Sequence, residues 1–157
     1  MTGPLLLYGS ESGTAADLAA RVAALGERRQ LSMRPEGLDA AFGAEADPVA
    51  ALRERALGDS GGLVIFMVST MGDGEVPNNM ARFWRSCLKR SLGSDSLAGV
   101  SYALYALGDS GYGHKFCAAG RKFDQRLQQL GAQPFLTRVL ADDQVAPTSL
   151  LPPLKLS

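Results

Sequence analysis

The segment of residues 9–15, GSESGTA, places three hydroxyl groups around a glycine just before a predicted helix. The first turn of a helix has free N–H groups and a partial positive charge, so such a segment can bind a phosphate without a cation. No Lys or Arg lies between Gly9 and Ala20, which excludes a Walker A loop, and the segment has no GxGxxG motif for a dinucleotide. The same residues also suit an ordinary capped helix after a turn, and this segment alone leaves both interpretations open.

Two further segments are rich in glycine: STMGDGEVP at residues 69–77 and GDSGYGH at residues 108–114. Gly72 and Gly74 permit positive φ angles and close approach of the backbone. Tyr112 lies among glycines, where a core side chain is not expected. Backbone groups with one aromatic side chain suit a flat ring that is held at its edge and covered on its face.

Five apolar segments predict the strands of one sheet: residues 4–8, 31–35, 63–68, 100–107 and 134–140. Segments with helical spacing lie between them, so the fold class is α/β, a parallel sheet with helices on both faces. Pro35 and Pro134 place the second and fifth strands at the edges, in the order 2-1-3-4-5. The three candidate loops then meet at the carboxyl ends of strands one, three and four, where such sheets bind ligands.

Four helices are expected between the strands. The first is predicted to end at Gly26 and the fourth at Gly131. The second is predicted to begin at Asp47, with Pro48 in its first turn, and to end at Gly58. The third carries an apolar stripe of Met80, Phe83, Trp84, Cys87 and Leu88. Its outer face carries Arg82, Arg85, Lys89 and Arg90.

The composition restricts the class of protein. Of the 157 residues, 46% are hydrophobic and 20% are charged, which is typical of one soluble globular domain. The 16 basic and 16 acidic side chains give a net charge of zero, which argues against binding of nucleic acid. Cys87 and Cys117 lie far apart, which excludes a disulfide framework and fits a reducing compartment, and His114 is the single histidine. Since no apolar run is long enough to span a bilayer and the first residues lack a basic region, a cytoplasmic location without membrane contact is expected.

Four strings resemble the FMN-binding domain of the diflavin reductases: SESGTA, STMGDGEVPNNM, ALGDSGYGHKF and LADD. The resemblance extends from Leu5 to about Gln144. It implies a flavodoxin-like three-layer sandwich over residues 1–144, with FMN as the cofactor. Within the family, the chain is most similar to the branch that serves cytosolic iron–sulfur protein assembly.

The resemblance assigns the FMN phosphate to the first segment: Ser10, Glu11, Ser12, Gly13, Thr14 and Ala15. It assigns the ring and the ribityl chain to the other loops: Ser69, Thr70, Met71, Gly72, Asp73, Gly74, Leu107, Gly108, Asp109, Tyr112, His114, Phe116, Cys117 and Asp142. Tyr112 is expected to stack on the ring, and Gly72 to offer its carbonyl to the flavin N5–H. No catalytic side chain and no metal ligand are expected.

The chain departs from the family pattern at several positions. Met71 stands where many relatives have an aromatic residue, and Cys117 where asparagine is usual, so Cys117 is expected to be buried at a helix start. The family continues into a fifth helix after Gln144. Residues 145–157 contain three prolines, so that helix is expected to be missing and the segment to form a tail or linker.

The resemblance also implies partners. FAD- and NADPH-binding domains are expected in the same polypeptide, and electrons are expected to leave FMN singly for an iron–sulfur acceptor similar to anamorsin. The fragment itself is expected to be a monomer that does not oxidise NADPH. Acidic loop residues are expected to steer a basic partner: Glu11, Asp73, Glu75, Asp109, Asp142 and Asp143. Two alternatives stay open: a stand-alone NAD(P)H:quinone oxidoreductase of the same fold, and a scaffold without flavin.

Overall fold

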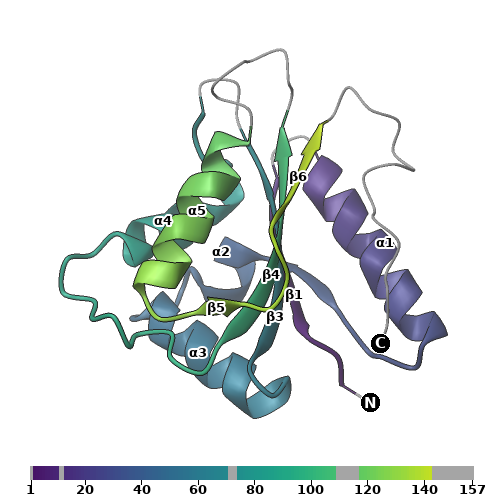
Figure 1. Ribbon diagram of the computed structural model, residues 1–157, viewed down its shortest axis with the longest axis horizontal. Helices are drawn as coiled ribbons and strands as arrows, with labels where there is room; N and C mark the ends of the chain where they lie inside the picture. Colours follow the sequence, from purple (N-terminus) through teal and green to yellow (C-terminus); the bar gives the residue numbers. More distant parts are fainter. Residues whose placement is uncertain (1, 11–12, 71–73, 109–116, 143–157) are drawn as a thin grey trace.

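A parallel sheet forms the centre of the computed structural model, which describes residues 2–10, 13–70, 74–108 and 117–142. Its inner strands are β1 (Leu5–Gly9), β3 (Leu63–Ser69) and β4 (Ser101–Gly108), and its outer strands are β2 (Pro35–Gly37), β5 (Gln133–Pro134) and β6 (Val139–Asp142). The strands pair in parallel in the order β2-β1-β3-β4-β5, and β6 also pairs with β4 (Figure 1). The predicted fold class and strand order are therefore confirmed.

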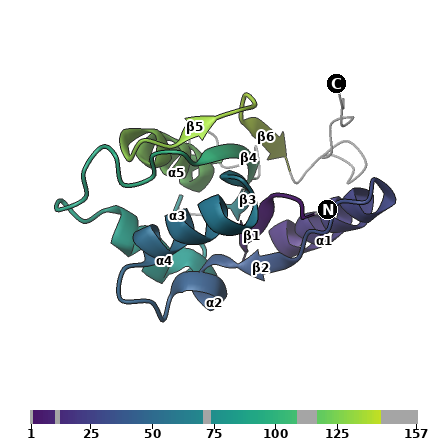
Figure 2. The same ribbon diagram turned by 90° about the horizontal axis from the view of Figure 1, so that it is seen from below.

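Helices cover both faces of this sheet. In the described residues they are α1 (Thr14–Arg28), α2 (Leu38–Phe42), α3 (Pro48–Asp59), α4 (Ala81–Cys87) and α5 (Ala118–Gln129), with a 3-10 turn, η1 (Asn78–Met80), before α4. Helix α1 lies on one face, and α3, α4 and α5 lie on the other (Figure 2). The predicted absence of a helix after Gln144 concerns residues outside the described part of the chain.

The core has two parts, one on each face of the sheet. Under α1, Leu6 of β1 and Met67 of β3 pack with Val22. On the other face, Phe66 packs edge-on against Phe123 of α5, with 5.0 Å between the ring centroids. The central strands contribute to both clusters, which is the reason for their unbroken apolar sequences.

The fifth predicted strand is wrong as one continuous element. Residues 133–142 form two short strands, β5 and β6, that pair with different parts of β4. Between them, Arg138 turns toward α5, and its Nη1 lies 2.9 Å from a carboxylate oxygen of Asp124. Asp124 is buried and also accepts a hydrogen bond from the Tyr102 hydroxyl, at 2.5 Å. The ion pair therefore connects the segment between β5 and β6 to helix α5.

The second predicted strand is displaced along the chain. It was expected at residues 31–35, but β2 begins at Pro35 and ends at Gly37. The earlier residues run beside the N-terminus, where Gly3 donates a backbone hydrogen bond to Ser32 at 2.9 Å. Both edge strands nevertheless contain the prolines that predicted them.

The predicted helix ends are partly correct. Asp47 caps α3 by accepting a hydrogen bond from the Ala50 amide at 3.1 Å, and Gly131, with φ 98°, follows α5 as predicted. Gly26 does not end α1, which continues to Arg28. A Cβ atom at Gly26 would lie 2.3 Å from Cε of Met33, so this glycine makes room for a packed side chain.

Helix α4 is short and is held at both ends by other elements. The carboxylate of Asp39 accepts hydrogen bonds from the amides of Arg82 and Phe83, at 3.1 and 2.8 Å. At the other end, Nε of Arg126 donates to the Cys87 carbonyl at 2.6 Å. These bonds satisfy backbone groups that every helix end leaves open.

The apolar stripe predicted for α4 is only partly buried. Met80, Phe83 and Cys87 are fully buried, but Leu88 lies after the end of the helix and is 50% exposed. Trp84 is half-buried and packs against Phe123, with 6.1 Å between the ring centroids. Leu88 therefore does not belong to the core, contrary to the prediction.

Candidate functional site

The loop between β1 and α1 is closed by the side chain of Ser10. This side chain is buried, and its oxygen accepts hydrogen bonds from the amides of Gly13 and Ala15, at 3.0 and 3.2 Å. Ser10 therefore acts as a cap for the first turn of α1, and its hydroxyl hydrogen can still be donated to a ligand. Gly13 has φ 90°, which favours glycine, and nothing lies within 4 Å of the place where a Cβ would stand.

Asn79 fixes this loop from a distant part of the chain, and sequence reasoning missed it. Its Oδ1 accepts a hydrogen bond from the Ser10 amide at 2.8 Å, across 69 residues of sequence. The neighbouring Met80 packs so closely on Gly9 that a Cβ there would lie 2.3 Å from the sulfur. The only signal in the sequence was the pair of asparagines after Pro77, inside the string quoted for the second loop.

The second candidate loop begins at the carboxyl end of β3. The Thr70 amide donates to the Leu107 carbonyl at 3.0 Å, and the Thr70 hydroxyl accepts from the Ala119 amide at 3.2 Å. Ser69 has a different environment, since its hydroxyl oxygen is buried and has no hydrogen-bond partner among the described residues. An unsatisfied buried hydroxyl is costly, so it indicates a missing partner at this point.

The third candidate loop begins where β4 meets the start of α5. A Cβ at Gly108 would lie 2.7 Å from the Cys117 nitrogen, so only glycine fits this approach. Cys117 is fully buried at the helix start, as predicted, and has φ 55°. Its thiol donates to the Ala106 carbonyl at 3.2 Å. Leu107 is also buried, in the cluster under α1.

Strand register brings these ends together. Gly9 pairs with Val68, Ser69 with Leu107, and Gly108 with Asp142. The carboxyl ends of β1, β3, β4 and β6 therefore lie together at one end of the sheet. The first turns of α1 and α5 lie next to them (Figure 1). Buried Gly74, with φ 91°, returns the second loop toward η1.

Nine of the predicted site residues lie outside the described part of the chain: Glu11, Ser12, Met71, Gly72, Asp73, Asp109, Tyr112, His114 and Phe116. Their roles stay predictions. Among the acidic loop residues that were expected to steer a partner, Glu75 is exposed. Within the described residues, no three His, Cys, Asp or Glu side chains are placed to hold a metal ion.

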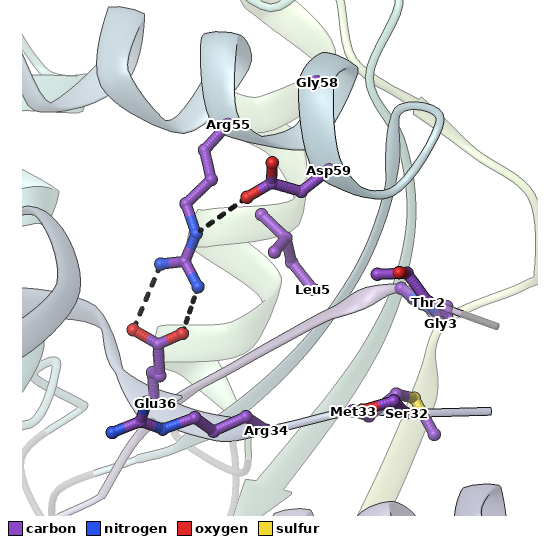
Figure 3. A pocket seen from close by; sticks show the side chains of 11 residues that line it. Thr2, Gly3, Leu5, Ser32, Met33, Arg34, Glu36, Arg55, Gly58 and Asp59 are labelled. Carbon is purple, nitrogen blue, oxygen red and sulfur yellow. Dashed lines mark hydrogen bonds and ion pairs between the residues drawn. The ribbon is translucent and has the colours of Figure 1, made fainter.

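A separate polar hollow of about 430 Å³ lies near the amino ends of β1 and β2, next to Thr2, Ser32 and Asp59. Figure 3 shows the Arg55 guanidinium in two parallel contacts with the Glu36 carboxylate, with Asp59 beside it. The hydrogen bond from Arg55 lowers the pKa of Glu36, and the same bond raises the pKa of Arg55. This ion pair links β2 to α3 and takes no part in the candidate site.

Several known proteins are similar to this chain in sequence. The flavodoxin family model matches residues 6–152. NADPH-dependent diflavin oxidoreductase 1 of Xenopus laevis is 41% identical over 140 residues, which are 89% of this chain and 21% of that protein. The protein of the same name from Danio rerio is 39% identical over 155 residues, which are 98% of this chain and 24% of the relative. The chain thus spans roughly a fifth to a quarter of the length of these relatives.

Solved structures show the same fold. The C101S mutant of flavodoxin from Pseudomonas aeruginosa superposes with a TM-score of 0.70 and 24% identity, covering 94% of this chain and 88% of that one. A Streptococcus pneumonia TIGR4 flavodoxin gives a TM-score of 0.68 and 23% identity, covering 96% of this chain and 90% of that one.

Among the described residues, no helix has both the length and the apolar character needed to cross a bilayer.

Proposed function

The chain belongs to the flavodoxin family, and from that premise we propose that it is an FMN-binding electron-transfer domain. The observation that carries this proposal is the buried Ser69 hydroxyl, which has no partner among the described residues and lies at the same end of the strands as the loop that Ser10 closes. A phosphate monoester with acceptor oxygens is the kind of group that satisfies such a hydroxyl.

The described residues fit the phosphate of FMN in three respects. Space is open beside Gly13, the Ser10 hydroxyl can donate, and the α1 N-terminus supplies partial positive charge. The chain has no Lys or Arg between Gly9 and Ala20, so neutral donors would hold the dianion. We assign the phosphate to residues 10–15 together with Ser69.

The remaining loops would hold the ring. Bound FMN supplies the redox chemistry, and the protein sets its position and its access to partners. We assign the ring contacts to the segments of residues 70–74 and 107–117, with Tyr112 as the covering aromatic residue. Asp142, paired with Gly108 in the sheet, stands at the end of β6, where the resemblance expects an acidic residue.

The electron donor and the acceptor are finer proposals. The relatives' name includes NADPH dependence and two flavins, and this chain corresponds to only a small part of their length. We infer that an FAD- and NADPH-binding module delivers the electrons in the cytosol, and that an iron–sulfur protein of the anamorsin type accepts them. Residues 1–144 would be the FMN domain, and residues 145–157 its tail or linker.

The Ser69→Ala variant tests the proposal. Removing an unsatisfied buried hydroxyl should leave the flavin-free protein equally stable or more stable, because that group is costly without a partner. The same change should weaken FMN binding by about ten- to a hundredfold, because a hydrogen bond to a charged phosphate is lost. Both effects are measurable, by urea unfolding of the flavin-free protein and by quenching of FMN fluorescence in a titration.

Ser32→Ala is a matched control, since Ser32 is exposed and lines the polar hollow near the amino ends of β1 and β2. It should change neither quantity. Unchanged FMN affinity in Ser69→Ala would remove Ser69 from the site. A wild-type chain that binds no FMN at all would contradict the proposal and favour the scaffold without flavin.

A further inference from the structure

The outer surface of α4 and the turn after it carries four exposed cations. We call Arg82, Arg85, Lys89 and Arg90 the basic α4 surface. The sequence has no acidic residue between Glu75 and Asp95, so no carboxylate on the same segment offsets this charge. The whole chain is neutral, so the charge is concentrated here rather than spread over the molecule.

The cations of this surface lack partners inside the described part of the chain. No ion pair of Arg82, Arg85, Lys89 or Arg90 is found there. The carboxylate of Asp39 is close, but it accepts hydrogen bonds from backbone amides at the start of α4. Among the described residues, nothing neutralises the four charges, which leaves them available to a partner.

The backbone that carries these charges is held firmly. Asp39 binds one end of α4, Arg126 binds the other, and Trp84 packs on Phe123 of α5. Within the helix, Arg82 and Arg85 stand about 4.5 Å apart along the axis at 1.5 Å per residue, and Lys89 and Arg90 follow in the turn after the helix. An ordered backbone adds no ordering cost of its own on binding, and the cost that remains is the rotamer freedom of the four long side chains.

Apolar side chains lie among the charges. Leu88 is 50% exposed, and Trp84 is half-buried. Arginine and tryptophan are the side chains that most often dominate the energy of protein interfaces. Nucleic acids engage longer rows of cations, and a membrane-bound helix buries its apolar face in lipid, whereas the apolar face of α4 is buried in the core.

We propose that the basic α4 surface docks an acidic segment of a protein partner. Carboxylates of that segment would meet the four cations, and an apolar side chain would cover Leu88 beside Trp84. The surface is joined to the candidate site, because η1 directly precedes α4 and its Asn79 binds the Ser10 amide. Its relevance to electron transfer rests on the proposed function, but docking itself does not require FMN.

Trp84 is the single tryptophan of the chain and reports binding at this surface. The probe is a synthetic peptide of Glu with interspersed Leu, titrated into the flavin-free and the FMN-loaded protein while Trp84 fluorescence is recorded. We expect saturable binding that weakens as salt is added, since screening acts on exposed charges. A peptide with Gln in place of every Glu should bind at least about tenfold more weakly.

The variant Arg85→Glu/Lys89→Glu should also weaken binding of the Glu peptide by about tenfold or more. The matched control is Arg21→Glu/Arg29→Glu, which changes the net charge equally at exposed positions on and just after α1. It should retain the affinity. If the first variant melts early, Arg85→Gln/Lys89→Gln replaces it and should lose a smaller part of the affinity.

Three results would overturn the inference. They are equal affinity for the Glu and Gln peptides, equal losses in the two charge-reversed variants, and binding of phosphatidylserine vesicles or single-stranded DNA without binding of the Glu peptide. FMN titration of the same samples keeps the two proposals apart. If the chain binds the Glu peptide but no FMN, the docking proposal holds and the proposed FMN site is wrong. If it binds FMN but not the Glu peptide, the FMN proposal holds and the docking proposal is wrong.

Discussion

Asn79 shows how much of the candidate site depends on single contacts between distant residues. Its oxygen accepts the Ser10 amide at 2.8 Å, and nothing near it in sequence foretells this partner, which lies 69 residues away. The loop motif around Ser10 could be recognised from residue types and local spacing. Its anchor could not, because hydrogen bonds between distant segments leave no periodic signal in the sequence.

Two substitutions of Asn79 separate its role as a hydrogen-bond acceptor for the Ser10 amide from the effect of a negative charge at this position. Asn79→Ala leaves the Ser10 amide without its acceptor and should reduce the free energy of unfolding by about 1–2 kcal/mol. Asn79→Asp keeps an acceptor and should restore most of that stability. Its negative charge lies beside the proposed phosphate loop, so it should still bind FMN more weakly than the wild type.

Urea unfolding and FMN titration of the two variants measure these effects. Gln125→Ala, at an exposed position of α5, is the control for the loss of an amide side chain. Equal FMN affinity in Asn79→Asp and the wild type would contradict the placement of the phosphate near Ser10.

At the scale of elements, two helices contain glycines in opposite environments. Gly120 lies in α5 against β4, where a Cβ would stand 2.3 Å from the Ala106 Cβ. Gly58 lies in α3, where a Cβ would meet nothing within 4 Å. The side chain of Ala106 has no torsion that could move its Cβ away, so the two glycines should respond differently to the same substitution.

Gly120→Ala should destabilise the protein by about 1–3 kcal/mol, because α5 must move away from the sheet. Gly58→Ala should be stabilising by up to about 1 kcal/mol, because alanine favours a helix over glycine. Chemical unfolding curves compare the two directly. A neutral Gly120→Ala variant would mean that α5 packs less closely on β4 than described.

The elements also show which predictions from sequence were possible. The strands β1, β3 and β4 were expected because each is an unbroken apolar segment, and the helices α1, α3 and α5 because each has enough residues to show the helical period. Helix α2, with five residues, is too short for such a pattern and was not predicted. The division of the fifth strand into β5 and β6 was missed because it involves a tertiary pair, Arg138 with Asp124.

At the scale of the whole molecule, a buried thiol and two tyrosine hydroxyls make the free energy of unfolding depend on pH in the alkaline range. Burial raises the pKa of the Cys87 thiol from 9.0 to about 12. Burial also raises the pKa of the Tyr105 hydroxyl, and burial with a hydrogen bond to Asp124 raises that of Tyr102. In the folded chain these groups keep protons that they release at lower pH once the chain unfolds.

The sign of the effect follows from these directions. The neutral forms contribute stability in full below pH 9.0, the ordinary pKa of the thiol, and that contribution is lost as the pH rises toward about 12. The free energy of unfolding should therefore fall from about pH 9 upward, as urea unfolding in a series of buffers would show. Cys87→Ala should fall less steeply, and a wild-type stability that stays flat would contradict the burial of these groups.

The distant anchors also determine when the site matures during synthesis. Ser10 leaves the ribosome long before Asn79, and Thr70 long before Ala119, the residue whose amide it binds. Strand β4, which pairs with β3, is also made after both loops that it supports. A nascent chain interrupted before η1 would have both loop sequences but neither Asn79 nor Ala119, the distant partners of Ser10 and Thr70. If these loops hold FMN as proposed, its binding is expected to follow the closure of the whole domain.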